Sequence, residues 1–193
     1  MSHLKKKNYG FTLLETLIVI GIIGITAVIA TPSIIAMLRN IRVNGAAKNL
    51  MSELMLAKFR AISENNKYIV TFDTTNNSFS IYDDNDNDGV ADTNELYKTV
   101  NIGTDYPDVR YGYISGTIGA GGTVIASSIT FSGTPPSITF NTDGTANKNG
   151  TVYMILSQDI TASRQNRMKA ITVITTGRIK SYRYETSVNP PWE

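Results

Sequence analysis

The sequence predicts an α+β protein in which one long N-terminal helix precedes an antiparallel, β-rich globular head. Three observations indicate this class. Residues 11–38 form an almost uncharged apolar run, one-sided apolar periodicity continues through residues 39–66, and short alternating segments separated by turn residues fill residues 67–193. A chain of 193 residues is long enough to bury a core without metals or disulfides.

The apolar run has the length and the flanks of a transmembrane helix. Three lysines at positions 5–7 precede it, and Glu15 is the only charged side chain in residues 8–38. A spanning helix needs about 20 apolar residues, and the lysines predict a cytoplasmic N-terminus in the inner membrane with the head in the periplasm. A secretory signal peptide is the alternative. It is disfavoured because its apolar region is usually about 7 to 15 residues long and because no cleavage signal leads into a polar domain.

Beyond Pro32 the pattern becomes one-sided, which is typical of an amphipathic helix. The apolar residues that recur at steps of three and four are Ile34, Leu38, Ile41, Ala47, Leu50, Leu54, Ala57 and Ala61. The helix is therefore predicted to run from about Phe11 to Glu64. Pro32, Gly21 and Gly24 predict bends or soft spots within it.

The remainder of the chain alternates between apolar and polar residues, as half-buried strands do. Val152, Met154 and Leu156 are expected to share one face of a strand, as are Ile138 and Phe140. Residues 74–77 are predicted to close a hairpin. Strands are predicted for residues 68–73, 78–83, 96–100, 128–132, 137–141, 151–156, 170–175 and 178–184.

The segment KKKNYGFTLLETLIVI resembles the class III leader of type IV pilins and type II secretion pseudopilins. A short basic leader, residues 1–10, ends in Gly10, Phe11 follows, and Glu15 is the fifth residue after that junction. The resemblance implies that a prepilin peptidase cleaves between Gly10 and Phe11 and that Phe11 becomes N-methylated. The mature chain would hold 15 basic and 16 acidic residues, a net charge of −1.

Glu15 is the residue expected to carry assembly. An ionised carboxylate in a membrane helix costs about 2.5 to 3.5 kcal/mol on insertion scales, so it needs a partner or a place near the interface. Cleavage would create a terminal amine on Phe11, which is four positions from Glu15 and close to it on one helix. The resemblance implies that Glu15 meets the amine of a neighbouring subunit as helices stack in a filament. The alternative is that Glu15 only snorkels to the membrane face.

The β-rich part resembles one branch of this superfamily, the GspH/FimT-type minor pilins and pseudopilins. Residues 129–146 contain a Phe-x-x-x-Gly strand and turn, and residues 170–182 contain a strand that ends in Thr-Gly-Arg. The resemblance implies a pilin-like fold and a subunit near the tip of a type IV pilus or type II secretion pseudopilus, supporting assembly and protein secretion. Its implied partners are other pilin subunits, the peptidase and inner-membrane lipid. A major pilin is disfavoured by these motifs and by the lack of a terminal cysteine pair.

The acidic segment DNDNDGVADTNE, residues 84–95, matches the calcium loop of EF-hands position by position. Alternate oxygens wrap the cation, Gly89 permits the sharp turn, and a final glutamate closes the shell. The segments on either side are predicted strands, so we expect a lone calcium loop between strands. The alternative is a solvated turn rich in Asn and Asp. The predicted calcium ligands are Asp84, Asp86, Asp88, the Val90 carbonyl, Asp92 and Glu95.

The segment GRIKSYRY places three cations, Arg178, Lys180 and Arg183, among tyrosines near the C-terminus. On a strand Arg178 and Lys180 share a face with Tyr182 and Tyr184, and cations beside stackable rings suit DNA. Some FimT-type members carry a Gly-Arg-x-Arg motif associated with DNA uptake, and this chain departs from it at Lys180. We favour the other interpretation, a charged edge strand that resists aggregation.

The residue inventory disfavours an enzyme. Cysteine is absent, and the only histidine, His3, lies in the predicted leader. Most hydrolytic triads and histidine-based metal sites therefore have no residues to form them, and neither a Ser-Lys nor a paired-carboxylate arrangement stands out.

Overall fold

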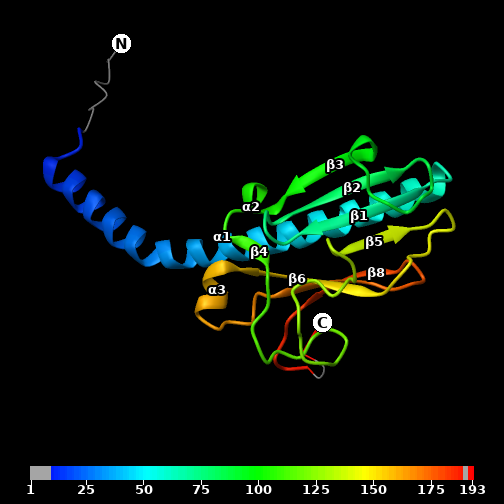
Figure 1. Cartoon of the computed structure of the whole chain (residues 1–193). Helices are drawn as coiled ribbons and strands as arrows, with labels where there is room; N and C mark the ends of the chain where they lie inside the picture. The colour runs from blue at the N-terminus through cyan, green and yellow to red at the C-terminus, as the bar shows by residue number, and fades with distance from the viewer. Residues whose placement is uncertain (1–9, 189–190) are drawn as a thin grey trace, which may run out of the picture. The chain divides into compact units, whose positions relative to one another are not determined.

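The computed structural model describes residues 10–188 and 191–193, so the predicted leader lies outside the described residues except for Gly10. The chain divides after Leu38 into two compact units. Helix α1 (Leu13–Ser63) contains residues of both units. Figure 1 shows the order of the elements along the chain.

The part of α1 that belongs to the first unit is exposed along its whole length. Every residue from Gly10 to Leu38 is exposed, and α1 contains a window with a mean hydropathy of 2.5, long and apolar enough to cross a membrane. The Thr26 and Thr31 hydroxyls donate to carbonyls one turn earlier, at 2.9 and 2.7 Å, so these polar groups are satisfied inside the helix. The helix stays uninterrupted through Pro32.

The later part of α1 packs into the head along one stripe. Its buried residues are Val43, Ala46, Ala47, Leu50, Leu54, Ala57 and Ala61. These residues belong to the same hydrophobic core as side chains from both sheets. Of the residues predicted for the apolar stripe, Ala47, Leu50, Leu54, Ala57 and Ala61 are buried, whereas Ile34, Leu38 and Ile41 are exposed. The small residues in the buried set allow close approach of the strands.

The first sheet has the order β3-β2-β1-β5 and is antiparallel throughout. The hairpin between β1 and β2 turns at Asn77, where φ is 52°, and the Asp73 carboxylate accepts from the Thr75 and Asn76 amides. In Figure 1 β1 and β2 run alongside the later part of α1. The strands are β1 (Lys67–Asp73), β2 (Ser78–Asp84), β3 (Leu96–Asn101) and β5 (Ser137–Phe140).

The second sheet has the order β4-β6-β7-β8, also antiparallel. Every residue of β6 is buried, because the strand has a hydrophobic cluster on each face. Val152, Met154 and Leu156 enter the main core, whereas Tyr153 and Ile155 pack in a second cluster. The predicted alternation is confirmed. The strands are β4 (Val109–Tyr111), β6 (Gly150–Leu156), β7 (Lys169–Val173) and β8 (Ile179–Arg183).

The strand predicted for residues 128–132 is wrong. Ile129 makes only an isolated bridge to Val152, and the Thr130 hydroxyl accepts from the Thr151 amide at 2.7 Å. A side chain thus replaces a backbone acceptor, and Gly133, with φ at 121°, then turns the chain. The sequence also did not predict β4, α2 (Ile102–Asp105), α3 (Ser157–Thr161) or the 3₁₀ helix η1 (Thr93–Glu95).

The C-terminal tail is bound to the head. Trp192 is buried, and its indole N–H donates to the Ile118 carbonyl at 2.7 Å. The backbone of Glu193 exchanges two hydrogen bonds with Arg183 of β8. Tail residues 191–193 therefore cover part of the edge that β8 would otherwise expose.

Candidate functional site: the N-terminal segment, the acidic loop and the turn motifs

The N-terminal segment presents the predicted processing and assembly residues to solvent. Phe11 precedes the first helical residue, and the Thr12 hydroxyl caps the helix by accepting from the Glu15 amide at 3.2 Å. Phe11 is 77% exposed. Phe11 lies two residues before the start of α1, and Glu15 lies in its first turn.

The two GspH/FimT-type motifs meet in space. Gly144 ends the turn after β5, Gly177 lies in the turn between β7 and β8, and both have positive φ, at 79° and 74°. A Cβ at Gly177 would collide with the Gly144 carbonyl oxygen. The Lys58 ammonium of α1 donates to the Gly177 carbonyl at 2.9 Å. No local sequence signal indicates Lys58, which lies 119 positions from Gly177.

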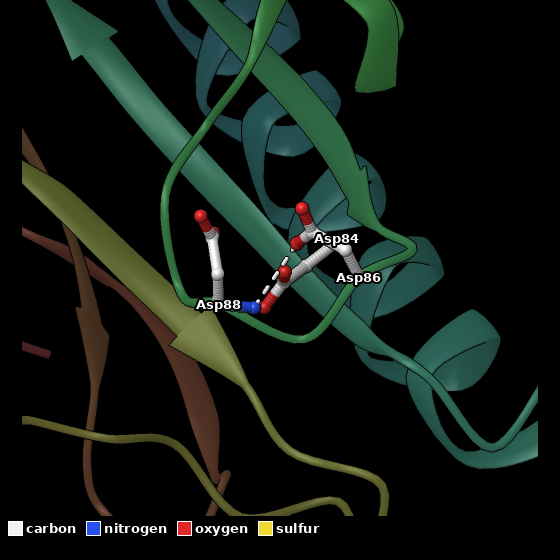
Figure 2. A group of neighbouring side chains, drawn as sticks. All are labelled: Asp84, Asp86 and Asp88. Carbon is white, nitrogen blue, oxygen red and sulfur yellow. Dashed lines mark hydrogen bonds between the residues drawn. The ribbon is translucent and has the colours of Figure 1, made fainter.

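The acidic loop joins β2 to η1 and gathers three of the predicted calcium ligands. One carboxylate oxygen from each of Asp84, Asp86 and Asp88 lies within 4.8 Å of the others, and Figure 2 shows the three side chains converging on one side of the loop. Two oxygens on opposite sides of a calcium ion are separated by about 4.6 to 5.2 Å, twice the bond length. These three residues could therefore hold one metal ion.

Burial and hydrogen bonding hold Asp84, the first of the predicted ligands, in place. Asp84 is fully buried at the end of β2, and its carboxylate accepts from the Gly89 amide at 3.2 and 3.3 Å. Gly89 has φ at 80°, as expected for a sharp turn. The Asp88 amide donates to the Asp86 carboxylate at 3.1 Å (Figure 2).

Glu95, the predicted closing ligand, lies outside this group of three but is turned toward the start of the loop. Only 5% of it is exposed, and its Oε1 accepts from the Asn85 amide at 2.8 Å. Its Oε2 is buried and has no hydrogen-bond partner among residues 10–188 and 191–193. Asp92 is exposed, and its carboxylate lies outside this group of three. Val90 is exposed as well.

The basic strand is split between two faces of the second sheet. Arg178 and Lys180 line one shallow pocket with Tyr182, as the alternation predicted. Arg183 lies on the other face and pairs with Glu185 at 2.9 Å. The three cations therefore do not form one continuous DNA-binding surface.

A long exposed apolar helix joined to a two-sheet antiparallel head defines the class of membrane-anchored, pilin-like subunits. The sequence matches the family model of type II transport protein GspH over residues 46–177, and the prokaryotic N-terminal methylation motif over residues 5–31. The chain belongs to the GspH family, and it is a minor pilin or pseudopilin of the type IV pilus and type II secretion superfamily. The family is structural and is not known as enzymatic.

One solved structure agrees with this assignment at the level of fold, and a second is reported as similar. The minor pseudopilin EpsH of the type II secretion system of Vibrio cholerae is 9% identical with a TM-score of 0.50, covering 74% of this chain and 97% of that one. The type IV minor pilin FimU of Pseudomonas aeruginosa is 13% identical with a TM-score of 0.46, covering 72% of this chain and 90% of that one. No curated protein sequence matches this chain. The DNA-binding alternative gains no support over the assignment as a filament subunit.

Proposed function

We propose that this chain is anchored in the inner membrane with its N-terminus in the cytoplasm and its head in the periplasm, and that it enters a pilus or pseudopilus through α1. Cleavage between Gly10 and Phe11 would remove the leader and allow N-methylation of Phe11. Glu15 would then pair with the terminal amine of a neighbouring subunit. The observation that carries this proposal is the exposed apolar surface from Gly10 to Leu38, in which Glu15 is the only formal charge.

We further propose that the subunit lies near the tip of the filament. EpsH is described as a minor pseudopilin, and a minor subunit need not present the same head surface as a major pilin. The head would contact other minor subunits, and the machine that it serves would be identified by the secretion or pilus genes beside its own.

Leader removal and N-methylation provide the first test of the proposal. In cells that hold the peptidase, the wild-type chain should lose ten residues and gain one methyl group on Phe11, as measured by intact mass of the membrane fraction. Gly10→Ala should slow or stop removal of the leader, because it adds a Cβ directly at the cut, and should lower the amount of the chain in sheared filaments. Gly21→Ala serves as the control, since a Cβ at Gly21 meets nothing within 4 Å. A Gly10→Ala chain that is cleaved and incorporated as efficiently as the wild type would contradict the proposal.

We also propose that the acidic loop binds one structural calcium ion through Asp84, Asp86 and Asp88, with the Val90 carbonyl, Asp92 and Glu95 completing the shell. Three carboxylates this close repel one another at neutral pH, and a divalent cation would remove that repulsion. The free, buried Oε2 of Glu95 suits a bidentate ligand, and oxygen-only ligands favour calcium over softer metals. A bound ion would fix the loop between β2 and β3.

Calcium titration of the full chain in mild detergent, after removal of metals with EDTA, tests this site. We expect a dissociation constant of about 10⁻⁴ to 10⁻³ M, the range of extracellular sites. At 100 times that constant, calcium should raise the free energy of unfolding by about 2.7 kcal/mol. Asp86→Asn with Asp88→Asn should abolish the effect, whereas Asp105→Asn, an exposed acid outside the loop, should preserve it. No heat of binding and an unchanged melting temperature in the wild-type chain would rule out the site.

A further inference from the structure

A cationic pocket lies in the head where α1 passes the second sheet. It has a volume of about 260 Å³ and includes side chains from α1, from the loop before β7, and from β7 and β8. None of its lining residues is acidic. The polar residues that line it are Asn40, Asn44, Asn166, Arg167, Lys169 and Arg183.

Two cations in this pocket are placed against each other. Lys169 of β7 and Arg183 of β8 are direct cross-strand partners, so their side chains emerge on the same face, where like charges destabilise a sheet. Burial lowers the pKa of the Lys169 ammonium, and the charges of Arg183 and Lys48 lower it further. No carboxylate within the described ranges lies in salt-bridge distance of Lys169. An anion bound between the Lys169 and Arg183 side chains would offset the repulsion between them.

Arg167, the third cation that lines the pocket, is neutralised by an ion pair. Arg167 is held by the fully buried Asp159 through two hydrogen bonds, Nε to Oδ2 at 2.7 Å and an Nη to Oδ1 at 2.6 Å. This pair fixes one wall of the pocket and leaves no net charge there. Arg183 donates one Nη to Glu185 at 2.9 Å, so its charge is partly compensated while its other N–H groups can still donate. Lys169 is thus the pocket cation with no acidic partner in the described ranges, and the Asn40 and Asn44 amides are further potential donors.

We propose that this pocket binds the phosphate of an anionic phospholipid headgroup, using Lys169, Arg183 and the two asparagine amides. Asn40 and Asn44 follow Leu38, the last residue of the apolar run, by two and six positions in α1. The inference rests on the membrane orientation proposed above, which places the end of the apolar run at Leu38 in the outer leaflet of the inner membrane.

The charges on α1 beside the pocket support a lipid over a free ion. Arg39 and Arg42 lie in the same turns as Asn40. Cations at the outer end of a span do not help to set the orientation by the positive-inside rule, but they attract anionic headgroups. A phosphate bound in the pocket would hold the head at the membrane surface before the subunit is extracted into a filament.

The test is retention of lipid by the full chain in mild detergent, counted by native mass spectrometry during titration with dioctanoyl phosphatidylglycerol. The wild-type chain should retain one lipid, and Lys169→Gln with Arg183→Gln should weaken binding at least about ten-fold, since both phosphate-binding charges are lost. The matched control is Arg178→Gln with Lys180→Gln, which removes the same charge from the opposite face of the sheet and should bind as the wild type does. Lys169→Arg keeps the charge and should retain the lipid.

Three results would overturn the assignment. Equal retention by the pocket variant and the control variant, both with wild-type thermal unfolding, would place the lipid elsewhere. Displacement of the lipid by an equal concentration of inorganic phosphate would make the pocket a free-anion site. A carbodiimide cross-link from Lys169 to another subunit in isolated filaments, without lipid retention, would make the ligand a protein carboxylate. Failure of the chain to enter bilayers would contradict the membrane orientation instead, and the titration in detergent does not depend on that step.

Discussion

Replacing Glu15 with alanine should leave leader removal intact and reduce incorporation into filaments by about ten-fold or more. The cut lies between Gly10 and Phe11, and Glu15 is beyond it in the first turn of α1, so the peptidase should still recognise the junction. Assembly would suffer because the neighbour's terminal ammonium loses its counter-charge in apolar surroundings, where an unpaired charge costs about 2.5 to 3.5 kcal/mol. A tenfold change corresponds to about 1.4 kcal/mol.

Quantification of the subunit in sheared filaments against the membrane fraction measures this effect. Glu15→Gln, which keeps the size but removes the charge, should fail in the same way. Thr16→Ala is the matched control, because it removes a neighbouring exposed polar side chain whose hydroxyl bonds only to the Leu13 carbonyl. If Glu15→Ala reached filaments at the wild-type level, Glu15 would have only an interfacial role.

Replacing Gly177 with alanine should destabilise the head by about 3 kcal/mol or more, a loss of the size seen for strained or overpacked sites. Two costs add. The positive φ of 74° disfavours any residue with a Cβ, and the new Cβ would collide with the Gly144 carbonyl oxygen. Relief of that collision would move the Gly177 carbonyl away from the Lys58 ammonium, so α1 would lose its hydrogen bond to this turn.

Urea unfolding of the full chain in detergent, followed by circular dichroism, measures the loss. Gly116→Ala is the control that separates the two costs, since Gly116 has nearly the same φ, 79°, but nothing within 4 Å of a Cβ. It should cost only about 1 to 2 kcal/mol, the backbone term alone. Equal losses for the two variants would show that contact between the motifs adds no stability.

Much of the fold could be predicted because the determining signals are local. The apolar run indicates a long helix, whereas the one-sided periodicity that follows it and the alternation in β6 indicate burial against the core. Both α1 and β6 appear as expected. The prediction failed where a single side chain replaced a backbone partner, as the Thr130 hydroxyl does for residues 128–132. Short elements such as β4 and α3 carry too few residues to show a period.

The candidate sites also divide into features that are local in the sequence and features that depend on the tertiary structure. The leader, Glu15 and the spacing of the acidic loop are properties of the sequence by itself, because processing motifs and calcium loops are contiguous. The structure decided that Asp84, Asp86 and Asp88 converge while Glu95 keeps a free oxygen. It also separated Arg183 from Lys180 and set Arg183 against Lys169. Only strand register and the packing of α1 on the sheets place residues this far apart in the chain at one point, and neither can be deduced from local pattern alone.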